Sequence, residues 1–554
     1  MSEVQVVNGE LGAKLDRYMS RITPFGFSGA LLVAKNGKVL LTKGYGMAVR
    51  EKGVPNTAET VFCTGSITKQ FTAAAVMKLW MKGKVDTEDR VGVYLPDVPD
   101  DKSLVTVHNL LTHTAGLGDS VGDDYEVLSR DVFVRRVLNE PLLSKPGTIY
   151  EYSNAGFGLL AAIVEIVSGE SYEEFLHENL FVPAGMAFTG YRLPDWSGKV
   201  VADWYVGEVN NGNSLGKPFP HWNLVGNGGI LSTTGDMFKW HVALKDDSIL
   251  SPEAKEKLFT PFLNDYAYGW GVSQSEYGKL IGHDGGNDLG ATADFRWFVD
   301  HDVATIIFSN RAYFHGFKAI LLRDKVAGLV FGRDVSVPPE VDDTFSVDVS
   351  RFLGSYRLTS GDLFRISYSE GMLVLEAIGQ NAIGMLFPAE GERFLDAERL
   401  NRLSVEICEG VLKDDYSGFE DVLKDIDTLD RKRRFVEGVL RKRELGAVKK
   451  VEAVGSLPFW RREGAVETVV QVVFEGGAVS LAFVWHEGRL WGIPGSPDKP
   501  LLTLKPVSAL RFGGYSLNLS RGAMVDFIVG SEGNVVALAV NGGAEAKKNC
   551  RLTL

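Results

Sequence analysis

Residues 61–82, VFCTGSITKQFTAAAVMKLWMK, predict a short extended segment, a tight turn at Gly65 and a buried helix. We expect this helix to run from about Ser66 to Lys82 and to end at Gly83, because glycine tolerates the left-handed conformation of a helix cap. The segment is rich in strong helix formers. Its apolar side chains recur at helical spacing, which predicts burial: Ile67, Phe71, Ala74, Ala75 and Leu79.

Ser66 and Lys69 lie three residues apart, so the hydroxyl and the amine point to the same side of this helix. A serine becomes a nucleophile when a base takes its proton, and a lysine is that base only if burial leaves its amine neutral. The helix N-terminus adds free N–H groups where an oxyanion would form. The pattern alone is weak evidence, because it recurs in loop-like segments at Ser214–Lys217 and Ser496–Lys499. The alternative is a helix cap and a solvated lysine.

Length and composition indicate a globular protein of several domains. At 554 residues the chain is too long for one hydrophobic core. Hydrophobic residues make up 45% and charged residues 23% of the sequence, which is ordinary for such proteins. The net charge of −12 argues against a general nucleic-acid binder.

Three further patterns exclude other classes of protein. The three cysteines are far apart and show no disulfide or zinc spacing, and the nine histidines include no His-x-x-x-His pair, so we predict no metal and no other cofactor. The N-terminus lacks an apolar segment of signal-peptide type. The longest apolar run, Ala155–Val164, is too short to span a bilayer. We therefore expect a cytoplasmic protein with no membrane partner.

A second candidate group is Tyr152-x-Asn154, the only Tyr-x-Asn in the chain. A nearby ammonium would lower the pKa of the tyrosine, since a cation favours phenolate, and the residue would then carry protons between nucleophile, water and leaving group. Asn154 would bind a substrate carbonyl. The alternative is a buried tyrosine beside a turn asparagine. His113, in a helix predicted over residues 105–116, is another candidate proton carrier, for which we favour a structural role.

The third candidate stretch is HDGGN, residues 283–287, which precedes two apolar strands. Its adjacent glycines would let a substrate approach the backbone closely. His283 would supply a proton or a positive charge. His-x-Gly occurs again at His486, so the tripeptide alone is not informative.

The first 335 residues predict one α+β domain, followed by a linker over residues 336–348. Short alternating segments then predict all-β, barrel-like domains, interrupted by a basic helical segment near residues 416–450. We favour two such domains, 349–450 and 451–554, over one barrel that contains the helical segment as an insertion. Expected elements of the first domain include a helix over 11–22, a hairpin at Asn36-Gly37, helices over 155–168 and 234–244, strands over 293–299 and 303–309, and a closing helix over 315–329.

Taken in order, Ser66-Ile67-Thr68-Lys69, Tyr152-Ser153-Asn154 and His283-Asp284-Gly285 resemble the motifs of the serine beta-lactamase-like family. That family also contains penicillin-binding DD-peptidases, D-aminopeptidases and esterases. The resemblance covers roughly residues 11–329 and implies an antiparallel sheet flanked by helices, together with a helical lobe. D-aminopeptidases are closest in layout, because they also carry β-domains after the hydrolase domain.

The resemblance implies roles for these residues. Ser66 would be the acylated nucleophile, Lys69 its base or hydrogen-bond partner, and Tyr152 the proton shuttle. The N–H groups of Ser66 and Gly286 would form the oxyanion hole, and His283 would complete the catalytic set. The substrate would contact Asn154, Gly285 and Asn287.

The third motif departs from the Lys-Thr-Gly of many members of the family. A lysine there suits a substrate carboxylate as a fixed cation, whereas a histidine is mostly neutral near pH 7. Asp284 adds negative charge. These differences weaken the case for a carboxylate-bearing substrate such as penicillin, and they fit a free amine or a neutral ester.

We therefore expect a serine hydrolase that works through an acyl-enzyme, as an aminopeptidase or amidase on short peptides or amides with an N-terminal D-residue. A carboxylesterase or weak beta-lactamase is the alternative, and a non-catalytic binding protein is a remote one. The expected partner is a small peptide, amide or ester rather than nucleic acid, and a homo-oligomer is left open.

Overall fold

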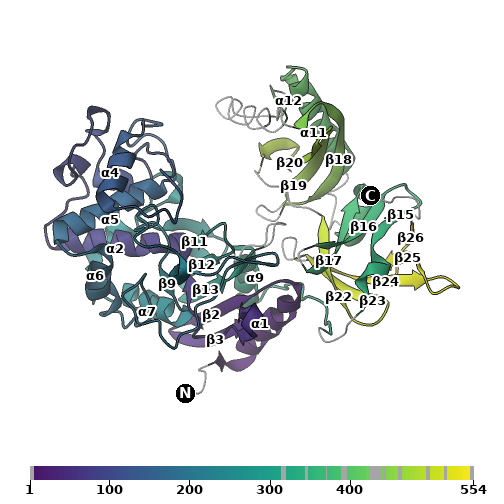
Figure 1. The fold of residues 1–554 in the computed structure, drawn as a ribbon, viewed down its shortest axis with the longest axis horizontal. Coiled ribbons are helices and arrows are strands. Elements are labelled where there is room, and N and C mark those ends of the chain that lie inside the picture. Colours follow the sequence, from purple (N-terminus) through teal and green to yellow (C-terminus); the bar gives the residue numbers. More distant parts are fainter. Residues whose placement is uncertain are drawn as a thin grey trace. The chain divides into compact units, whose positions relative to one another are not determined.

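The structure, a computed structural model, divides the chain into two compact units (Figure 1). The chain passes from the first unit to the second between Val335 and Ser336. The described residues are 5–312, 320–342, 347–369, 371–387, 396–420, 422, 436, 440, 445–459, 464–493, 500–516 and 521–548.

A seven-stranded antiparallel sheet forms the centre of the first unit (Figure 1). Asn36 and Gly37 turn the predicted hairpin with positive φ angles of 52° and 70°, as a two-residue turn requires. In spatial order the strands are β1 (Val6–Val7), β3 (Lys38–Tyr45), β2 (Gly29–Lys35), β13 (Val303–Ser309), β12 (Thr292–Phe298), β11 (Gly278–Gly286) and β10 (Gly271–Ser275).

Helices cover both faces of this sheet. Strand β2 is buried along nearly its whole length, which requires a packed layer on each side. Ala30, Leu32 and Ala34 belong to the large core that contains the central helices, whereas the alternate residues Leu31 and Val33 point to the other side. Helices α1 (Gly9–Ile22) and α9 (Ile320–Val330) contact each other and the sheet, and α7 (Thr234–Lys245) packs on β2 and β13.

The helix predicted over residues 66–82 lies at the centre of the helical lobe. It consists of a single 3-10 turn, Gly65–Ile67, followed by α2 (Thr68–Met81), and the chain leaves it at Gly83 with a φ of 65°. The other lobe helices are α3 (Val107–Leu111), α4 (Arg130–Asn139), α5 (Asn154–Ser168), α6 (Tyr172–Leu176) and α8 (Pro252–Leu258). Helix α2 packs on α5, α6 and α8, and most of its side chains are buried.

Two predicted helices of this unit differ from the structure. The helix predicted over 105–116 ends at Leu111, because His113 and then Gly116 adopt positive φ angles of 57° and 75°. The closing helix predicted over 315–329 is described from Ile320 to Val330, and its first five predicted residues lie outside the described residues.

Short strand pairs join the loops around the site. Strand β6 (Phe62–Cys63) pairs with β9 (Leu231–Ser232), and this pair fixes the segment ahead of Ser66. The remaining short strands are β4 (Met47–Val49), β5 (Val54–Pro55), β7 (Tyr205–Val206), β8 (Val209–Asn210) and β14 (Arg311–Ala312).

One closed barrel organises the second unit. Its aromatic core includes Phe352, Phe512 and Phe527. The barrel strands are β15 (Gly354–Arg357), β16 (Leu363–Ser369), β17 (Met372–Ile378), β22 (Leu501–Pro506), β23 (Arg511–Ser516), β24 (Arg521–Val529), β25 (Val535–Val540) and β26 (Glu545–Lys548).

An insertion between β17 and β22 carries the rest of this unit, so the preferred division into domains 349–450 and 451–554 does not match the strand order. Local alternation predicts strands but not their partners, and β17 pairs with β22 across the whole insertion. Most of the predicted 416–450 helix lies outside the described residues, and its last three residues belong to β18. The insertion contains α10 (Gln380–Leu386), α11 (Ala397–Leu412), α12 (Ser417–Glu420), β18 (Val448–Pro458), β19 (Val466–Phe474), β20 (Gly477–His486) and β21 (Arg489–Gly492).

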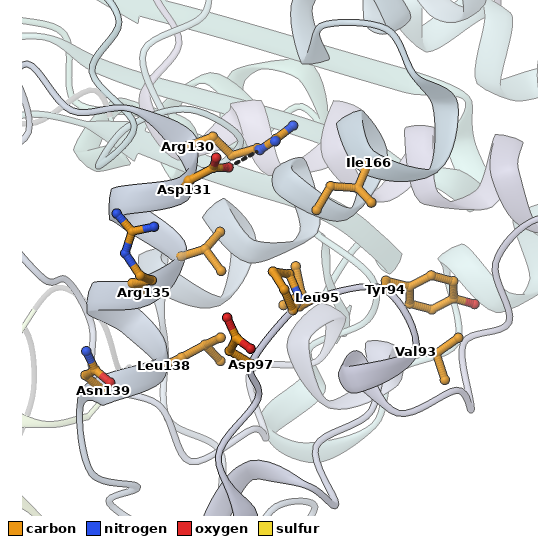
Figure 2. A pocket seen from close by; sticks show the side chains of 12 residues that line it. Val93, Tyr94, Leu95, Asp97, Arg130, Asp131, Arg135, Leu138, Asn139 and Ile166 are labelled. Atoms are coloured by element: carbon orange, nitrogen blue, oxygen red, sulfur yellow. Dashed lines mark hydrogen bonds and ion pairs between the residues drawn. The ribbon is translucent and has the colours of Figure 1, made fainter.

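A pocket of about 680 Å³ opens in the helical lobe beside α4 (Figure 2). Apolar side chains including Leu95, Val134 and Leu138 line it together with charged ones such as Asp97 and Arg135. None of the residues predicted for the site lines this pocket. Within the described part of the chain, no single helix has the length and apolarity to cross a membrane, although the bent pair Asn154–Ser168 and Tyr172–Phe181 meets those criteria together.

Candidate active site

The turn before Ser66 is pressed against the end of strand β11. Gly65 has a φ of 53°, and a Cβ there would lie 2.1 Å from the backbone nitrogen of Gly286. A Cβ on Gly285 would lie 2.2 Å from the carbonyl oxygen of Thr64 and 2.7 Å from the nitrogen of Ser66. Real Cβ atoms do not come so close, so glycine is required at both positions. The backbone nitrogen of Gly286 thus lies against Gly65, and that of Ser66 lies against Gly285.

Lys69 is fully buried beneath the half-buried Ser66. Its Nζ lies 3.0 Å from Ser66 Oγ, 2.7 Å from Asn154 Oδ1 and 2.9 Å from the carbonyl oxygen of Asn227. Burial lowers the pKa of Lys69 to about 7, against the opposing effect of nearby carboxylates that include Asp119. A substantial fraction of Lys69 is therefore neutral at physiological pH.

The partners of Lys69 fix the direction of its lone pair. The Asn154 Nδ2 donates to the Asp119 carboxylate at 3.0 Å, and because a carboxylate only accepts, the Asn154 oxygen must face Lys69. A neutral amine has two N–H groups, and the oxygens of Asn154 and Asn227 can use both. Its lone pair is then left for the third neighbour, the Ser66 hydroxyl. This is the geometry in which a lysine accepts a serine proton.

Tyr152 contacts both Ser66 and Lys69. Its ring centroid is 4.7 Å from Lys69 Nζ, and its hydroxyl is hydrogen-bonded to Ser66. Burial raises the pKa of Tyr152 above the ordinary tyrosine value, and the Ser66 hydrogen bond opposes this only in part. The prediction that a cation lowers this pKa is therefore wrong, because the cost of burying a phenolate is the larger effect. Tyr152 stands beside Ser66 as a neutral phenol.

His113 holds the backbone on both sides of Tyr152. The Glu151 N–H donates to the His113 carbonyl at 2.8 Å, and the Ser153 N–H donates to His113 Nδ1 at 3.0 Å. The imidazole centroid is 4.3 Å from that of Tyr152. Burial lowers the pKa of His113 well below the ordinary value. These contacts favour the structural role over the proton-carrier alternative.

His283 is buried with both ring nitrogens engaged. Nδ1 lies 2.5 Å from the carbonyl oxygen of Asp284, and Nε2 lies 3.0 Å from the hydroxyl of Tyr266. Burial lowers the pKa of His283 to about 4, although Asp284 acts in the opposite direction. His283 is therefore an uncharged ring in this site at neutral pH.

The three residues predicted to contact substrate differ in the contacts that they already make within the protein. Gly285 lies against the nucleophile turn. Both polar atoms of the Asn154 amide are bound within the protein, so this residue orients Lys69. The Asn287 Oδ1 accepts from the N–H groups of Leu289 and Ala291 at 3.0 Å each and so holds the turn after β11.

Sequence reasoning missed several residues of the site. Asp119, Asn227 and Tyr266 contact the predicted residues directly, but all three come from loops and carry no periodic or motif signal.

Asp124 and Asp284 also act electrostatically on Lys69. Arg296 lies 2.7 Å from the buried Asp294 and 3.6 Å from Asp284. Among the described residues no group of three His, Cys, Asp or Glu is placed to hold a metal ion.

Comparison with known proteins identifies the family to which the chain belongs. The Beta-lactamase family matches residues 23–327. Penicillin-binding protein 4* of Bacillus subtilis strain 168 is 31% identical over 412 residues, which cover 69% of this chain and 89% of that protein.

Two solved structures share the fold. The octameric penicillin-binding protein homologue from Pyrococcus abyssi aligns over 98% of this chain and 99% of its own, with a TM-score of 0.54 and 19% identity. The D-amino acid amidase from Ochrobactrum anthropi SV3 aligns over 58% of this chain and 99% of its own, with a TM-score of 0.51 and 21% identity. The chain therefore belongs to the beta-lactamase family, within the group of serine hydrolases and penicillin-binding proteins that its three motifs resemble.

Proposed function

We propose that this protein is a serine aminopeptidase or amidase that cleaves short peptides or amides through an acyl-enzyme at Ser66. The substrate carries a free amine, and its N-terminal residue has the D-configuration. The D-preference rests on the resemblance to D-aminopeptidases, and the other parts of the proposal rest on the geometry of the site.

The observation that carries the proposal is the uncharged His283. Both of its nitrogens are bound within the protein, so the position offers no fixed cation to a substrate carboxylate. Asp119, Asp124 and Asp284 act on Lys69 through space and therefore lie near the nucleophile. A site with this balance of charge favours a substrate ammonium and disfavours a carboxylate.

Acylation follows from the direction of the Lys69 lone pair. Ser66 Oγ attacks the carbonyl carbon while its proton passes to neutral Lys69 Nζ. The tetrahedral oxyanion is stabilised by the N–H groups of Ser66 and Gly286. Tyr152, a phenol, gives its proton to the leaving amine and recovers one from the Lys69 ammonium. The amine thus leaves neutral, and Ser66 is left as an ester.

Deacylation uses the same groups in reverse. A water molecule attacks the ester carbon and gives its proton to Lys69. Ser66 Oγ then leaves with a proton supplied through Tyr152 or directly from the ammonium. The carboxylic acid is released, and Lys69 returns to the neutral state.

The first test is release of p-nitroaniline from D-alanine p-nitroanilide and from its L-enantiomer. We expect turnover of the D-substrate by the native chain and a loss of about 10⁴-fold or more in Ser66→Ala, since a nucleophile and its base act as a unit. Ser214→Ala is the matched control, because Ser214 is a buried serine in the same Ser-x-x-Lys spelling. Activity that survives in Ser66→Ala would overturn the proposal.

A second candidate function is acylation by a β-lactam or a simple ester on the same machinery. The observation that favours it is the 31% identity to a penicillin-binding protein. Intact-mass measurement with a penicillin, and hydrolysis of p-nitrophenyl acetate, test it directly. If neither anilide is cleaved but the ester is, this second function replaces the first. A native chain that forms no Ser66 adduct with a serine-reactive phosphonate would instead indicate a non-catalytic binding protein.

We also propose that the chain self-associates. The support is the full-length likeness to the Pyrococcus abyssi homologue, which is octameric. Light scattering on the eluting full chain gives its mass directly, and a mass of one chain, 60.6 kDa, at all concentrations would refute self-association.

A further inference from the structure

Tyr266 reaches the site from a strained turn after α8. Asn264 and Asp265 have positive φ angles of 56° and 55°, which residues other than glycine adopt uncommonly. The turn is closed in both directions. The Phe262 N–H donates to the Tyr266 carbonyl at 2.9 Å, and the Tyr266 N–H donates to the Leu263 carbonyl at 3.1 Å. Such strain persists only where the surroundings fix the conformation, and it is common at functional sites.

The side chain of Tyr266 connects the two halves of the site. It is 6% exposed, and its ring centroid lies 4.6 Å from that of His113 and 5.7 Å from that of Tyr150, both in the helical lobe. Its hydroxyl lies 3.0 Å from Nε2 of His283 on strand β11. Ring contacts with the helical lobe therefore position Tyr266, while its hydroxyl hydrogen-bonds His283 of the sheet.

The hydrogen bonds of His283 define its tautomer. Nδ1 faces the carbonyl oxygen of Asp284, which can only accept, so Nδ1 carries the proton. Nε2 then has a lone pair, and the Tyr266 hydroxyl donates to it. Protonation of Nε2 would replace this lone pair by a second N–H and would force the Tyr266 hydroxyl to turn its proton away. A hydrogen bond to the neutral form of a group disfavours the charged form.

The other groups facing His283 come from four segments of the chain. Burial has the largest effect and lowers its pKa. Lys69 of α2 and Arg296 of β12 also oppose protonation, whereas Asp284 of its own strand favours it. The neutral Tyr152 ring lies 6.4 Å away between centroids. Of these neighbours, Tyr266 is the one that hydrogen-bonds Nε2.

We propose that Tyr266 is a specificity-determining positioning residue, whose hydroxyl holds His283 in the neutral Nδ1–H form and so withholds a cation from carboxylate-bearing substrates. This inference deepens the proposed function, because it names the device that favours amine-bearing substrates. The part of the inference that concerns substrates rests on the proposed function. The part that concerns the protonation state of His283 does not rest on it.

The first measurement uses the native full chain labelled with ¹⁵N-histidine, at pH 7.5. The ring-nitrogen shifts of His283, assigned by loss of its signals in His283→Asn, should show a protonated Nδ1 and an unprotonated, hydrogen-bonded Nε2. The opposite tautomer would overturn the inference. This measurement requires no Tyr266 variant to fold.

The second measurement compares Tyr266→Phe with Tyr268→Phe. Tyr268 is also buried, and its hydroxyl lies 2.8 Å from a histidine nitrogen, Nδ1 of His108. In Tyr266→Phe the titration midpoint of His283 should rise by about one pH unit, since about one net hydrogen bond to the neutral ring is lost. In Tyr268→Phe it should not move. An unchanged midpoint in Tyr266→Phe would overturn the inference.

The third measurement tests specificity at pH 5 through the acylation rate with a fluorescent penicillin, which carries a carboxylate, relative to p-nitrophenyl acetate, which does not. From a native pKa of about 4, a rise of one unit takes the protonated fraction of His283 from about a tenth to about a half. The rate ratio should therefore rise about fivefold in Tyr266→Phe and stay constant in Tyr268→Phe. A constant ratio in Tyr266→Phe would overturn the specificity role. Failure of the native chain to cleave D-alanine p-nitroanilide would refute the proposed function alone, because neither the tautomer nor this ratio depends on that activity.

Discussion

Substitution of Lys69 by methionine should remove a pH dependence from the stability of the first unit. Lys69 is fully buried, and burial lowers its pKa to about 7, whereas a lysine in the unfolded chain keeps a pKa of about 10.4. Methionine has a similar length and no charge. The variant loses the titration, and it loses the Lys69 hydrogen bonds to Ser66, Asn154 and Asn227 at every pH.

The sign of the effect follows from proton binding. Between pH 7 and about 10.4 the unfolded chain binds the Lys69 proton and the folded chain does not, so folding is favoured as the pH rises through this window. With a folded pKa of about 7, this one group adds about 2.5 kcal/mol to the free energy of unfolding between pH 7.5 and pH 9.5. The stability difference between native protein and Lys69→Met should change by that amount across the two pH values.

Urea unfolding of the full chain, followed by tryptophan fluorescence at pH 7.5 and 9.5, measures this difference. Two units can unfold separately, and the transition of the first unit is the one that a phosphonate adduct at Ser66 shifts. Lys84→Met is the control, because Lys84 is exposed just beyond the same helix. Parallel pH dependences for native protein and Lys69→Met would refute the conclusion that Lys69 is neutral in the folded state.

Two further substitutions test the shape of the site through kcat for the best substrate. Gly285→Ala should lower kcat by about 10²-fold, as loss of an oxyanion donor does, because a Cβ there would lie 2.7 Å from the Ser66 nitrogen. Gly216→Ala, with nothing within 4 Å of its Cβ, should keep full activity, and equal activity of the two variants would contradict the close approach. His113→Leu should lower kcat by about 10²-fold with little change in KM, since Tyr152 loses its backbone support. His113→Asn should restore most of kcat, because asparagine tolerates a φ of 57° and offers a hydrogen-bond acceptor to the Ser153 N–H. If kcat is not restored, His113 does not act by positioning Tyr152.

The contact between Ser66 and Lys69 could be predicted because their relation is local. A hydroxyl and an amine three residues apart on a helix need no further information to lie together. The other partners of Lys69 could not be predicted, since Asn154 is 85 residues away and Asn227 is 158 residues away. The predicted direction of the Tyr152 pKa shift was wrong for a related reason. The charge of Lys69 is visible in the sequence, but the burial that outweighs it is a property of the packed lobe.

The fold shows the same division between local and distant information. The Asn36-Gly37 hairpin and the long strands of both units follow from turn residues and alternation. The true end of the helix predicted over 105–116 could not be predicted from local sequence, because His113 leaves helical geometry and binds the backbone around Tyr152. The order of the strands in the barrel could not be predicted either, because Leu375 pairs with Leu502 and no local pattern encodes that pairing.

The closure of the barrel has a consequence for how the chain is made. Strand β15, at the start of the second unit, pairs with β16 on one side and with β26 on the other, where Tyr356 lies opposite Lys548. The barrel therefore cannot close before β26 has been synthesised, because β26 is the last of the barrel strands in chain order. Until the later strands are made, the outer edges of β15 and β17 lack their partners β26 and β22, and open strand edges are templates for unwanted pairing. Pairing that must wait for distant strands makes the second unit, rather than the first, the part of the chain with the longest-lived unpaired strand edges during synthesis.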